Sequence, residues 1–504
     1  MSSIDEIKNT ERIRYLEQEN HHQKLVIAKL KHQLFGTKSE KVESPEIDQL
    51  LFNELEAEAA KATDDELEAQ TELIEGYARS KKGRGKRKPF PKDLEREVVE
   101  IDLPEVERFC PHDGSPLKAI GEEITEKLKV YPARTVVVVE KKKKYGCLCC
   151  GHHMAQAKSN AILPKTIATP ELLSFLIFSK FFQGLPFYRL EELFHLQGID
   201  LSRTLMASWL IRVSEKLQPI WNILEEWAMA SGYMAIDATH VQVLKEPGRP
   251  AESKSFMWAR GSPELGIVLF DYDVSGGGAV AKNLMRDFSG ALQADAHRGY
   301  RAIEKVKLLL LGCMMHSRRR FHKAWLEAKK KPGLAADALV MFKKLYDLEE
   351  AYKLQELTSH ERFEARQKEV GPHIAKMKTW AESKQGKILK SSTLGNAFHY
   401  FINEYDELSA FLQNGRYEID NGWIERAIRK FAIGRNNWMF CDTVDGAKAS
   451  SLLYSLVITA KLNGKDPFAA MTEIFRRLPD AETIDDYEKL ARLLVKSPTS
   501  IVVQ

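Results

Sequence analysis

The sequence predicts an α/β fold in which a mixed β-sheet with helices on both faces forms the core of a multidomain chain. Short apolar runs of strand length lie between residues 234 and 315, and stretches of helical periodicity separate the later ones. A chain of 504 residues is also too long for one compact core, so we expect about two to four domains.

The order of these segments predicts how the core is built. Strands are expected at 234–244, 255–260, 266–271, 291–294 and 307–315, with helices at 279–288 and after residue 300. From residue 315 to about 415 the sequence is helical and charged, which predicts an insertion before a last core helix. Three strands, helix, strand, helix, strand and helix is the order of ribonuclease-H-like folds.

Composition shifts set the expected boundaries of the modules. They are 1–79, a coiled coil and acidic helical region; 80–92, a basic linker; 93–164, a zinc-finger-like module; 165–228, a helix-turn-helix DNA-binding region; 229–325, the first part of the core; 326–415, the helical insertion; 416–475, the second part of the core; and 476–504, a C-terminal region.

Charge is segregated along the chain although its sum is small. Lys and Arg number 75 against 71 Asp and Glu, a formal net charge of +4. Basic residues gather at 81–92, 141–144, 318–330 and 426–435, which favours a polyanionic partner, although each stretch could be a solvated surface. Residues 80–92 carry seven basic side chains among Gly and Pro, and could be a flexible strap along a phosphate backbone or a plain linker.

The N-terminal region predicts a homodimer. Residues 6–36 carry a heptad pattern that favours a two-stranded parallel coiled coil, the alternative being an amphipathic helix packed on its own chain. Its seam residues are Ile13, Asn20, Ile27 and Leu34 at one position and Leu16, Gln23 and Leu30 at the other. The N-terminus has no apolar signal core, and the most apolar stretch, 172–185, is too short to span a bilayer. We expect a cytoplasmic protein that does not enter membranes.

Clustered cysteines predict a structural zinc site in a reducing compartment. Cys147 and Cys150 have C-x-x-C spacing, whereas Asp113 follows Cys110 where a second cysteine would be usual. The ligand set is therefore Cys110, Asp113, Cys147 and Cys150, with His112 or Cys149 as alternatives to Asp113. A metal-free β-ribbon with buried thiols is the other interpretation.

Residues 187–213 predict a helix, a turn and a second helix. Leu190, Leu193 and Phe194 mark the apolar side of the first helix, and Gly198 suits its left-handed C-cap. Ser202 is a predicted N-cap, with Leu205, Trp209 and Leu210 on the buried side of the second helix. The second helix could enter a major groove, with Arg203 as a DNA-binding candidate. Many helical hairpins of this kind bind nothing.

Three acidic residues predict a metal-dependent site. Asp237 lies inside an apolar run, Asp295 ends another, and Glu425 lies on a basic helix. An unpartnered charge in an apolar strand is costly, and neighbouring strands would bring Asp237 and Asp295 side by side, so a divalent cation is expected. Two Mg²⁺ or Mn²⁺ ions about 4 Å apart could support displacement at a phosphodiester.

Basic residues around Glu425 predict a phosphate-facing surface. The DNA-binding candidates there are Arg426, Arg429, Lys430, Arg435 and Trp438. The Glu425–Arg429 pair could be only a surface salt bridge, and Trp438 could stack on a base or pack in the core.

Several further residues lie near the predicted site in sequence. His240, His297 and His316 are each more often structural than catalytic. Cys313 and His316 have metal-like spacing, but Cys313 is assigned to an apolar strand and the core. Gly276–Gly278 lacks the Lys of a nucleotide loop, so ATP binding is not expected.

The chain resembles the transposases of the insertion sequence sixty-six family through an ordered set of short motifs. They are 34–41 (LFGTKSEK), 110–114 (CPHDG), 185–188 (LPFY), 237–239 (DAT), 293–295 (QAD), Cys313 with His316, 318–321 (RRRF), 425–427 (ERA), 434–438 (GRNNW) and 462–464 (LNG).

This resemblance implies a ribonuclease-H-like transposase with the catalytic triad Asp237, Asp295 and Glu425 on Mg²⁺. It further implies transposon-end DNA and target DNA as partners, small accessory proteins from the same element, and a bacterial protein that joins the nucleoid when bound to DNA. The Asp at 113 and the tail at 496–504 depart from the family pattern. The rival functions are a DNA-binding transposition repressor without catalysis and a simple nuclease.

Overall fold

The computed structural model describes residues 135–139, 144–146, 154–156, 161–295 and 308–496. The chain divides into compact units at 1–139 and 140–504, and every helix and strand described lies in the second. The predicted coiled coil, the basic linker and His297 lie outside the described residues, as do the predicted zinc ligands Cys110, Asp113, Cys147 and Cys150.

Strands and helices alternate in the first half of this unit, and helices dominate the second half. The strands are β1 Lys144–Gly146, β2 Met154–Gln156, β3 Tyr233–Lys245, β4 Lys254–Ser262, β5 Ile267–Asp273, β6 Gly290–Gln293, β7 Leu308–Leu311 and β8 Cys441–Thr443. The α-helices are α5 Pro170–Ile177, α6 Phe187–Leu196, α7 Arg203–Ala230, α8 Gly278–Leu284, α9 Met314–Glu327, α10 Leu334–Leu354, α11 Ser359–Ala365, α12 Gly371–Gln385, α13 Thr393–Asn403, α14 Tyr405–Ser409, α15 Gly422–Trp438, α16 Val444–Leu462, α17 Pro467–Arg477 and α18 Ile484–Ala491. Short π- and 3₁₀-helical turns lie at Phe178–Phe182, Arg366–Val370, Ala410–Gln413 and Leu478–Asp480.

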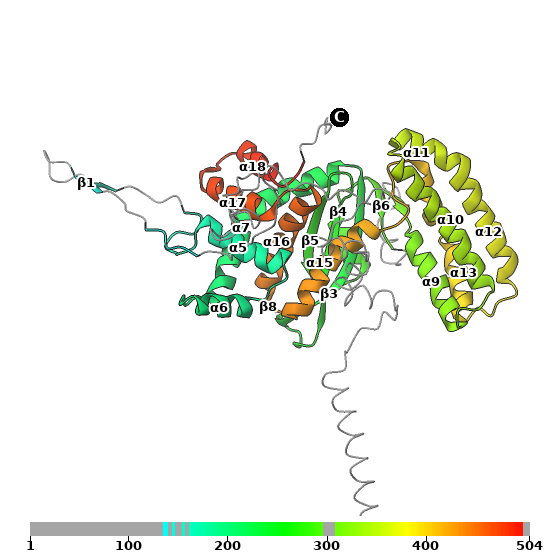
Figure 1. Cartoon of the computed structure of the whole chain (residues 1–504), viewed down its shortest axis with the longest axis horizontal. Helices are drawn as coiled ribbons and strands as arrows, with labels where there is room; N and C mark the ends of the chain where they lie inside the picture. Colours follow the sequence, from blue (N-terminus) through cyan, green and yellow to red (C-terminus); the bar gives the residue numbers. More distant parts are fainter. Residues whose placement is uncertain (1–134, 140–143, 147–153, 157–160, 296–307, 497–504) are drawn as a thin grey trace, which may run out of the picture. The chain divides into compact units, whose positions relative to one another are not determined.

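A mixed five-strand sheet in the order β5-β4-β3-β6-β7 forms the centre of the fold (Figure 1). β3, β4 and β5 pair antiparallel, whereas β6 and β7 continue the sheet in parallel. Beyond the end of β6, the short strand β8 pairs with the last residues of β3. The strands predicted at 234–244, 255–260, 266–271 and 291–294 are confirmed to within two residues at each end.

The last strand of the sheet differs from the prediction. A strand was expected at 307–315, but β7 ends at Leu311, and α9 begins at Met314 with Cys313 as its N-cap. The chain turns there because Gly312 donates its N–H to Glu407 O at 2.7 Å, which connects it to the helical region instead of the sheet. An apolar run does not by itself distinguish a buried strand from the first turn of a buried helix.

The predicted helix-turn-helix is present as two helices, but the second is far longer than expected. Gly198 has φ +75°, and the Ser202 hydroxyl accepts a hydrogen bond from Leu205 N, as predicted for the turn and the N-cap. The helix then runs 28 residues to Ala230, because its apolar stripe continues at intervals of three and four residues. Leu205 was placed on the buried side, yet it is 40% exposed, and the stripe begins at Met206.

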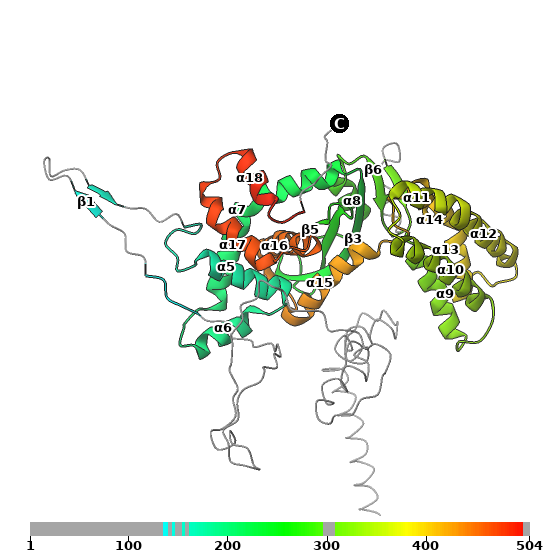
Figure 2. The same cartoon turned by 45° about the horizontal axis from the view of Figure 1, so that its top comes forward.

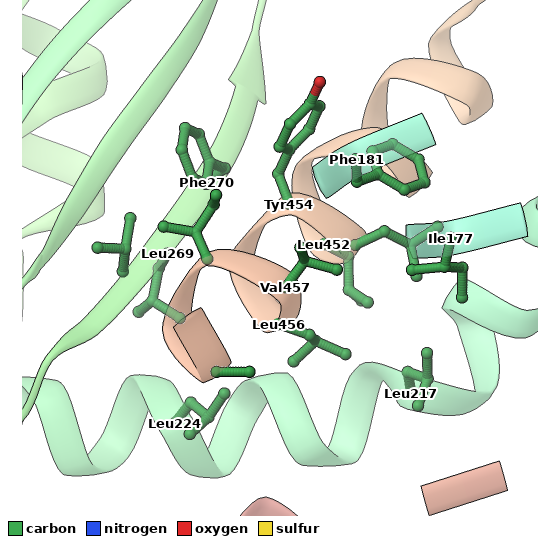
Figure 3. Packing of buried hydrophobic residues seen from close by; sticks show 14 of the residues in the cluster. Ile177, Phe181, Leu217, Leu224, Leu269, Phe270, Leu452, Tyr454, Leu456 and Val457 are labelled. Atoms are coloured by element: carbon green, nitrogen blue, oxygen red, sulfur yellow. The ribbon is translucent and has the colours of Figure 1, made fainter. Parts of the chain in front are cut away.

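The main hydrophobic core lies between the sheet and the helices α7 and α16. Figure 3 shows Leu452, Leu456 and Val457 of α16 between the strand that carries Phe270 and the long helix α7. Hydroxyl groups of α16 also bond the edge strand β5: Phe270 N donates to Ser455 Oγ at 2.8 Å. One helix thus covers the sheet and caps part of its open edge.

The predicted helical insertion is confirmed as a helical segment with its own core. Between Met314 and Gln413 the structure contains helices α9 to α14 with their π- and 3₁₀-helical turns and no strand (Figures 1 and 2). Its buried aromatic residues include Phe321, Phe342, Phe398 and Phe401. Just after this segment, Glu418 N donates a hydrogen bond to the hydroxyl of Tyr233 on β3 at 3.0 Å.

Within the described ranges, no helix is both long and apolar enough to cross a membrane.

Candidate active site

Asp237 lies near the middle of the 13-residue strand β3, at the centre of the sheet. Its neighbour on β4 is Ala259, and its Oδ1 accepts a hydrogen bond from Ala238 N at 2.7 Å. β6 pairs with β3 only as far as Ala235, and β8 pairs with β3 only from Val243 onward, so Asp237 lies between these two partners. The carboxyl group is therefore held in the sheet where its neighbouring strand stops.

Asp295 lies two residues past the end of β6, at the same level of the sheet. The parallel register pairs Tyr233 with Ala291 and Ala235 with Gln293, so its continuation brings residue 295 opposite residue 237. Gln293 fixes this end of β6, because its side-chain amide nitrogen, Nε2, donates to Gly312 O at 2.7 Å. The strands that carry the two aspartates are adjacent, as expected from the sequence.

Glu425 reaches the same region from the first turn of α15. Asn421, just before the helix, donates its side-chain N–H to Ile236 O at 2.9 Å, one residue before Asp237. Its backbone N–H donates to Cys313 Sγ at 3.2 Å. The start of α15 is thus fastened both to β3 and to the start of α9.

The three carboxyl groups interact electrostatically. Burial, followed by the charges of Glu425 and Asp295, raises the pKa of Asp237 to about 7. Burial also raises the pKa of Glu425, with Asp420 and Asp295 adding to the effect while Arg319 and Arg429 oppose it. Mutual repulsion of this kind is relieved by a cation or by a retained proton.

The residues nearest to Glu425 are basic and come from α9. Its Oε1 lies 3.8 Å from His316 Nδ1, and its Oε2 lies 3.7 Å from Arg319 Nη2. Neither His316 Nδ1 nor Glu425 Oε1, both buried, has a hydrogen-bond partner. Arg429, expected from helix spacing to pair with Glu425, only lowers the pKa of Glu425 through its charge, because the cation in contact with Glu425 is Arg319.

One group of ligand-type atoms lies close enough together to share a metal, and it is not the predicted triad. In the described part of the chain, Cys313, His316 and Glu425 each offer an atom within 4.8 Å of the others. Asp237 and Asp295 stand outside this group. The metal-like spacing of Cys313 and His316 was visible in the sequence, but assigning Cys313 to a strand hid its position beside Glu425.

The predicted DNA-binding residues fall into two sets. Arg426, Arg429 and Lys430 are exposed on α15, and Arg203 is exposed at the start of α7. Arg435 instead bends back to β3, where it donates to His240 O and to Thr239 Oγ1.

Trp438, the remaining DNA-binding candidate, is engaged within the protein. Its ring packs edge-on to Phe431 at 5.5 Å, and Lys180 Nζ lies 5.3 Å from its centre. This surrounding fits the packing alternative that the sequence left open.

Comparison with known proteins identifies the domain that carries this site. Residues 165–449, more than half of the chain, match the family described as "Transposase IS66 family", whose core is a DDE transposase domain. The chain belongs to the IS66 transposase family. Three further matches to parts of this family cover residues 22–99 ("Transposase C of IS166 homeodomain"), 107–151 ("zinc-finger binding domain of transposase IS66") and 455–491 ("IS66 C-terminal element").

Relatives that match most of this IS66 family protein occur in Sinorhizobium fredii (strain NBRC 101917 / NGR234). The uncharacterized protein y4hP is 27% identical over 92% of this chain and 87% of its own length. The uncharacterized protein y4qI is 29% identical over 84% of this chain and 80% of its own length. No solved structure matches the chain.

A DDE transposase domain implies a divalent metal, and the residues present fit one. The carboxyl group of Asp237 is buried close to two other negative charges, and Glu425 Oε1 is buried without a hydrogen-bond partner. The carboxylate oxygens of Asp237 and Glu425 thus have room for a cation, and carboxylate oxygens are the ligands that Mg²⁺ prefers. The zinc-finger match at 107–151 likewise suggests zinc binding by a module whose cysteines lie outside the described residues.

Proposed function

We propose that this IS66 family protein is an active DNA transposase that cleaves DNA at the ends of an insertion element and transfers those ends into target DNA. The single observation that supports the proposal most is electrostatic: the charges of Asp295 and Glu425 help to raise the pKa of Asp237. The three residues come from separated segments of a DDE transposase domain.

We further propose that the core has a ribonuclease-H-like fold. The strand order β5-β4-β3-β6-β7, with an antiparallel half and a parallel half, supports this assignment. So does the position of the third carboxylate on α15, a helix that follows β7 and the helical segment after it.

In this proposal the three carboxylates hold two Mg²⁺ or Mn²⁺ ions. Such ions, when bound, lower the pKa of an attacking water and stabilise the leaving oxygen of a phosphodiester. Asp237 and Asp295 orient that site from the rigid sheet, and Glu425 closes it from α15. Arg426, Arg429 and Lys430, all exposed on the same helix, neutralise phosphates of the bound strand.

Asp295→Asn tests the proposal, because the amide keeps the size of the side chain but loses its charge. Mg²⁺-dependent cleavage of a duplex carrying the element's terminal repeats should fall by at least about a thousandfold, whereas affinity for that duplex should change less than about threefold. Cleavage is read on denaturing gels and binding by fluorescence anisotropy.

Asp442→Asn is the matched control, since Asp442 is an exposed carboxylate on β8 that pairs with Lys245. It should cut at the wild-type rate. Normal cutting by the Asp295 variant would remove this residue from the site. Failure of the wild-type protein to cut, with tight binding to the repeats, would favour the transposition repressor.

A further inference from the structure

The start of α9 brings three metal-binding side chains together beside the proposed catalytic triad. Cys313, His316 and Glu425 offer a thiol, an imidazole and a carboxylate whose ligand atoms lie within 4.8 Å of one another. Two residues separate Cys313 and His316, so both side chains emerge from the same first turn of the helix. Glu425 approaches from α15.

The separations suit a tetrahedral ion. Zinc binds thiolate at about 2.3 Å and imidazole or carboxylate at about 2.0–2.2 Å, which leaves tetrahedral ligand atoms roughly 3.3–3.7 Å apart. His316 Nδ1 and Glu425 Oε1 are 3.8 Å apart, so a small side-chain movement would bring both into range. Neither atom has a hydrogen-bond partner, although both are buried.

Cys313 needs a cation to hold it as a thiolate. Burial raises the pKa of its thiol, and hydrogen bonds from the backbone N–H groups of Asn421, 3.2 Å from Sγ, and His316 oppose this rise. A bound Zn²⁺ would supply the missing positive charge, and the two backbone donors would orient the sulfur. Arg319 contacts Glu425 through Oε2, so Oε1 remains available on the side of His316.

We infer that Cys313, His316 and Glu425 form a site for one Zn²⁺ ion, with water as the fourth ligand. Thiolate and imidazole ligands select zinc over magnesium, whereas the all-oxygen triad selects magnesium. Glu425 belongs to both sets. The next step rests on the proposed function. Zinc bound here withdraws Glu425 from Asp237 and Asp295, and so it opposes binding of the catalytic metals.

Cobalt titration of the full-length protein tests the site independently of DNA cleavage. Cobalt replaces zinc, and each cobalt–thiolate bond adds a charge-transfer absorption, so both the number of ions bound and their thiolate ligands are measured. The cysteine-rich module at 107–151 contributes its own share, and therefore the result lies in differences between variants.

The design compares Cys313→Ser with Cys441→Ser. Serine at 313 keeps an acceptor for Asn421 N but loses the sulfur ligand, and Cys441 is the other buried free cysteine of the described chain. Cys313→Ser and His316→Ala should each bind one equivalent of cobalt fewer than the wild type, and Cys441→Ser should bind the wild-type number. Because the His316 side chain is partly exposed, we expect His316→Ala to fold, and it therefore measures cobalt binding at this site even if Cys313→Ser disturbs folding.

Equal cobalt stoichiometry in Cys313→Ser, His316→Ala and the wild type would overturn the site, and so would a loss in only one of the two variants. Asp295→Asn separates this inference from the proposed function, because it should keep the full cobalt–thiolate absorption even where it abolishes cleavage.

A second titration tests the shared use of Glu425. Saturating Zn²⁺ should weaken Mn²⁺ binding, followed by electron paramagnetic resonance, at least about tenfold in the wild type and in Cys441→Ser. It should leave Mn²⁺ binding unchanged in Cys313→Ser. Mn²⁺ affinity that is indifferent to zinc in every variant would refute the competition.

Discussion

Asp237 shows what it costs to keep a carboxyl group in the centre of a sheet. Folding raises its pKa from the ordinary 3.8 to about 7, chiefly by burial. Between those values the folded protein holds a proton that the unfolded chain has released. The stability of the metal-free fold therefore falls as the pH rises from about 4 to about 7, and then levels off.

Replacing Asp237 with Asn should stabilise the metal-free protein for this reason. A shift of about three pKa units corresponds to roughly 4 kcal/mol, and we expect about 2–4 kcal/mol of it to appear at pH 8, with a smaller gain at pH 5. Thermal unfolding followed by circular dichroism measures both. Mg²⁺ should raise the melting temperature of the wild type and leave that of the variant unchanged.

A variant that melts lower than the wild type at both pH values would show that Asp237 is held by favourable contacts, not by strain awaiting a cation.

Residues whose role depends on contacts with distant parts of the chain could not be predicted from the sequence. Asp237, Asp295 and Glu425 were selected because a charge in an apolar or basic setting is conspicuous in the sequence. Asn421 and Arg319 were not selected, since an Asn before a helix and an Arg in a basic run are ordinary. Only the fold brings Asn421 to Ile236 and Arg319 to Glu425.

At the scale of elements, the helical insertion is held by a buried ion pair. Arg366 is fully buried and bonds Glu349 through Nε at 2.8 Å, and its Nη1 donates to Phe411 O and Asn414 O. Arg362 bonds the same carboxylate at 2.7 Å. The pair thus connects α10 to the 3₁₀-helical turn at Ala410–Gln413 through the π-helical turn at Arg366–Val370.

Arg366→Met should destabilise the protein by about 3 kcal/mol, because it leaves part of the buried charge of Glu349 without a partner. Lys343→Ala is the matched control: Lys343 forms an exposed pair with Asp347 on α10, and its loss should cost less than about 1 kcal/mol. Thermal unfolding of the full-length proteins compares them. Equal melting temperatures for the two variants would mean that the ion pair adds nothing to stability.

The sequence predicts some elements better than others for physical reasons. β3 to β6 were found because each is a short apolar run bounded by Gly or polar residues. The true end of β7 was missed, since Gly312 and Cys313 continue an apolar run while the chain already turns into α9. The length of α7 was missed because Pro219 lies inside it, and a proline ordinarily ends a helical prediction.

At the scale of the whole molecule, the proposed joining of two element ends would need two subunits to hold them. The N-terminal region matched at residues 22–99 and the heptad at 6–36 are the candidates for pairing them. Asn20 at a seam position would fix a parallel register.

Removal of residues 1–36 should therefore convert a dimer into a monomer, measured as a halved mass by multi-angle light scattering. Substituting the seam residues Ile13 and Ile27 with Lys is a milder test that keeps the chain length, and it should have the same effect. An unchanged mass in both cases would remove the predicted zipper from the account.

The central claim is that Asp237, Asp295 and Glu425 together hold the catalytic metals. Anomalous scattering from crystals of the full-length protein with Mn²⁺ and element-end DNA locates those metals directly. We predict Mn²⁺ bonded by Asp237 and Asp295 at the open end of β6, with Glu425 completing the site. Manganese absent from these two carboxylates while DNA is bound would contradict the account.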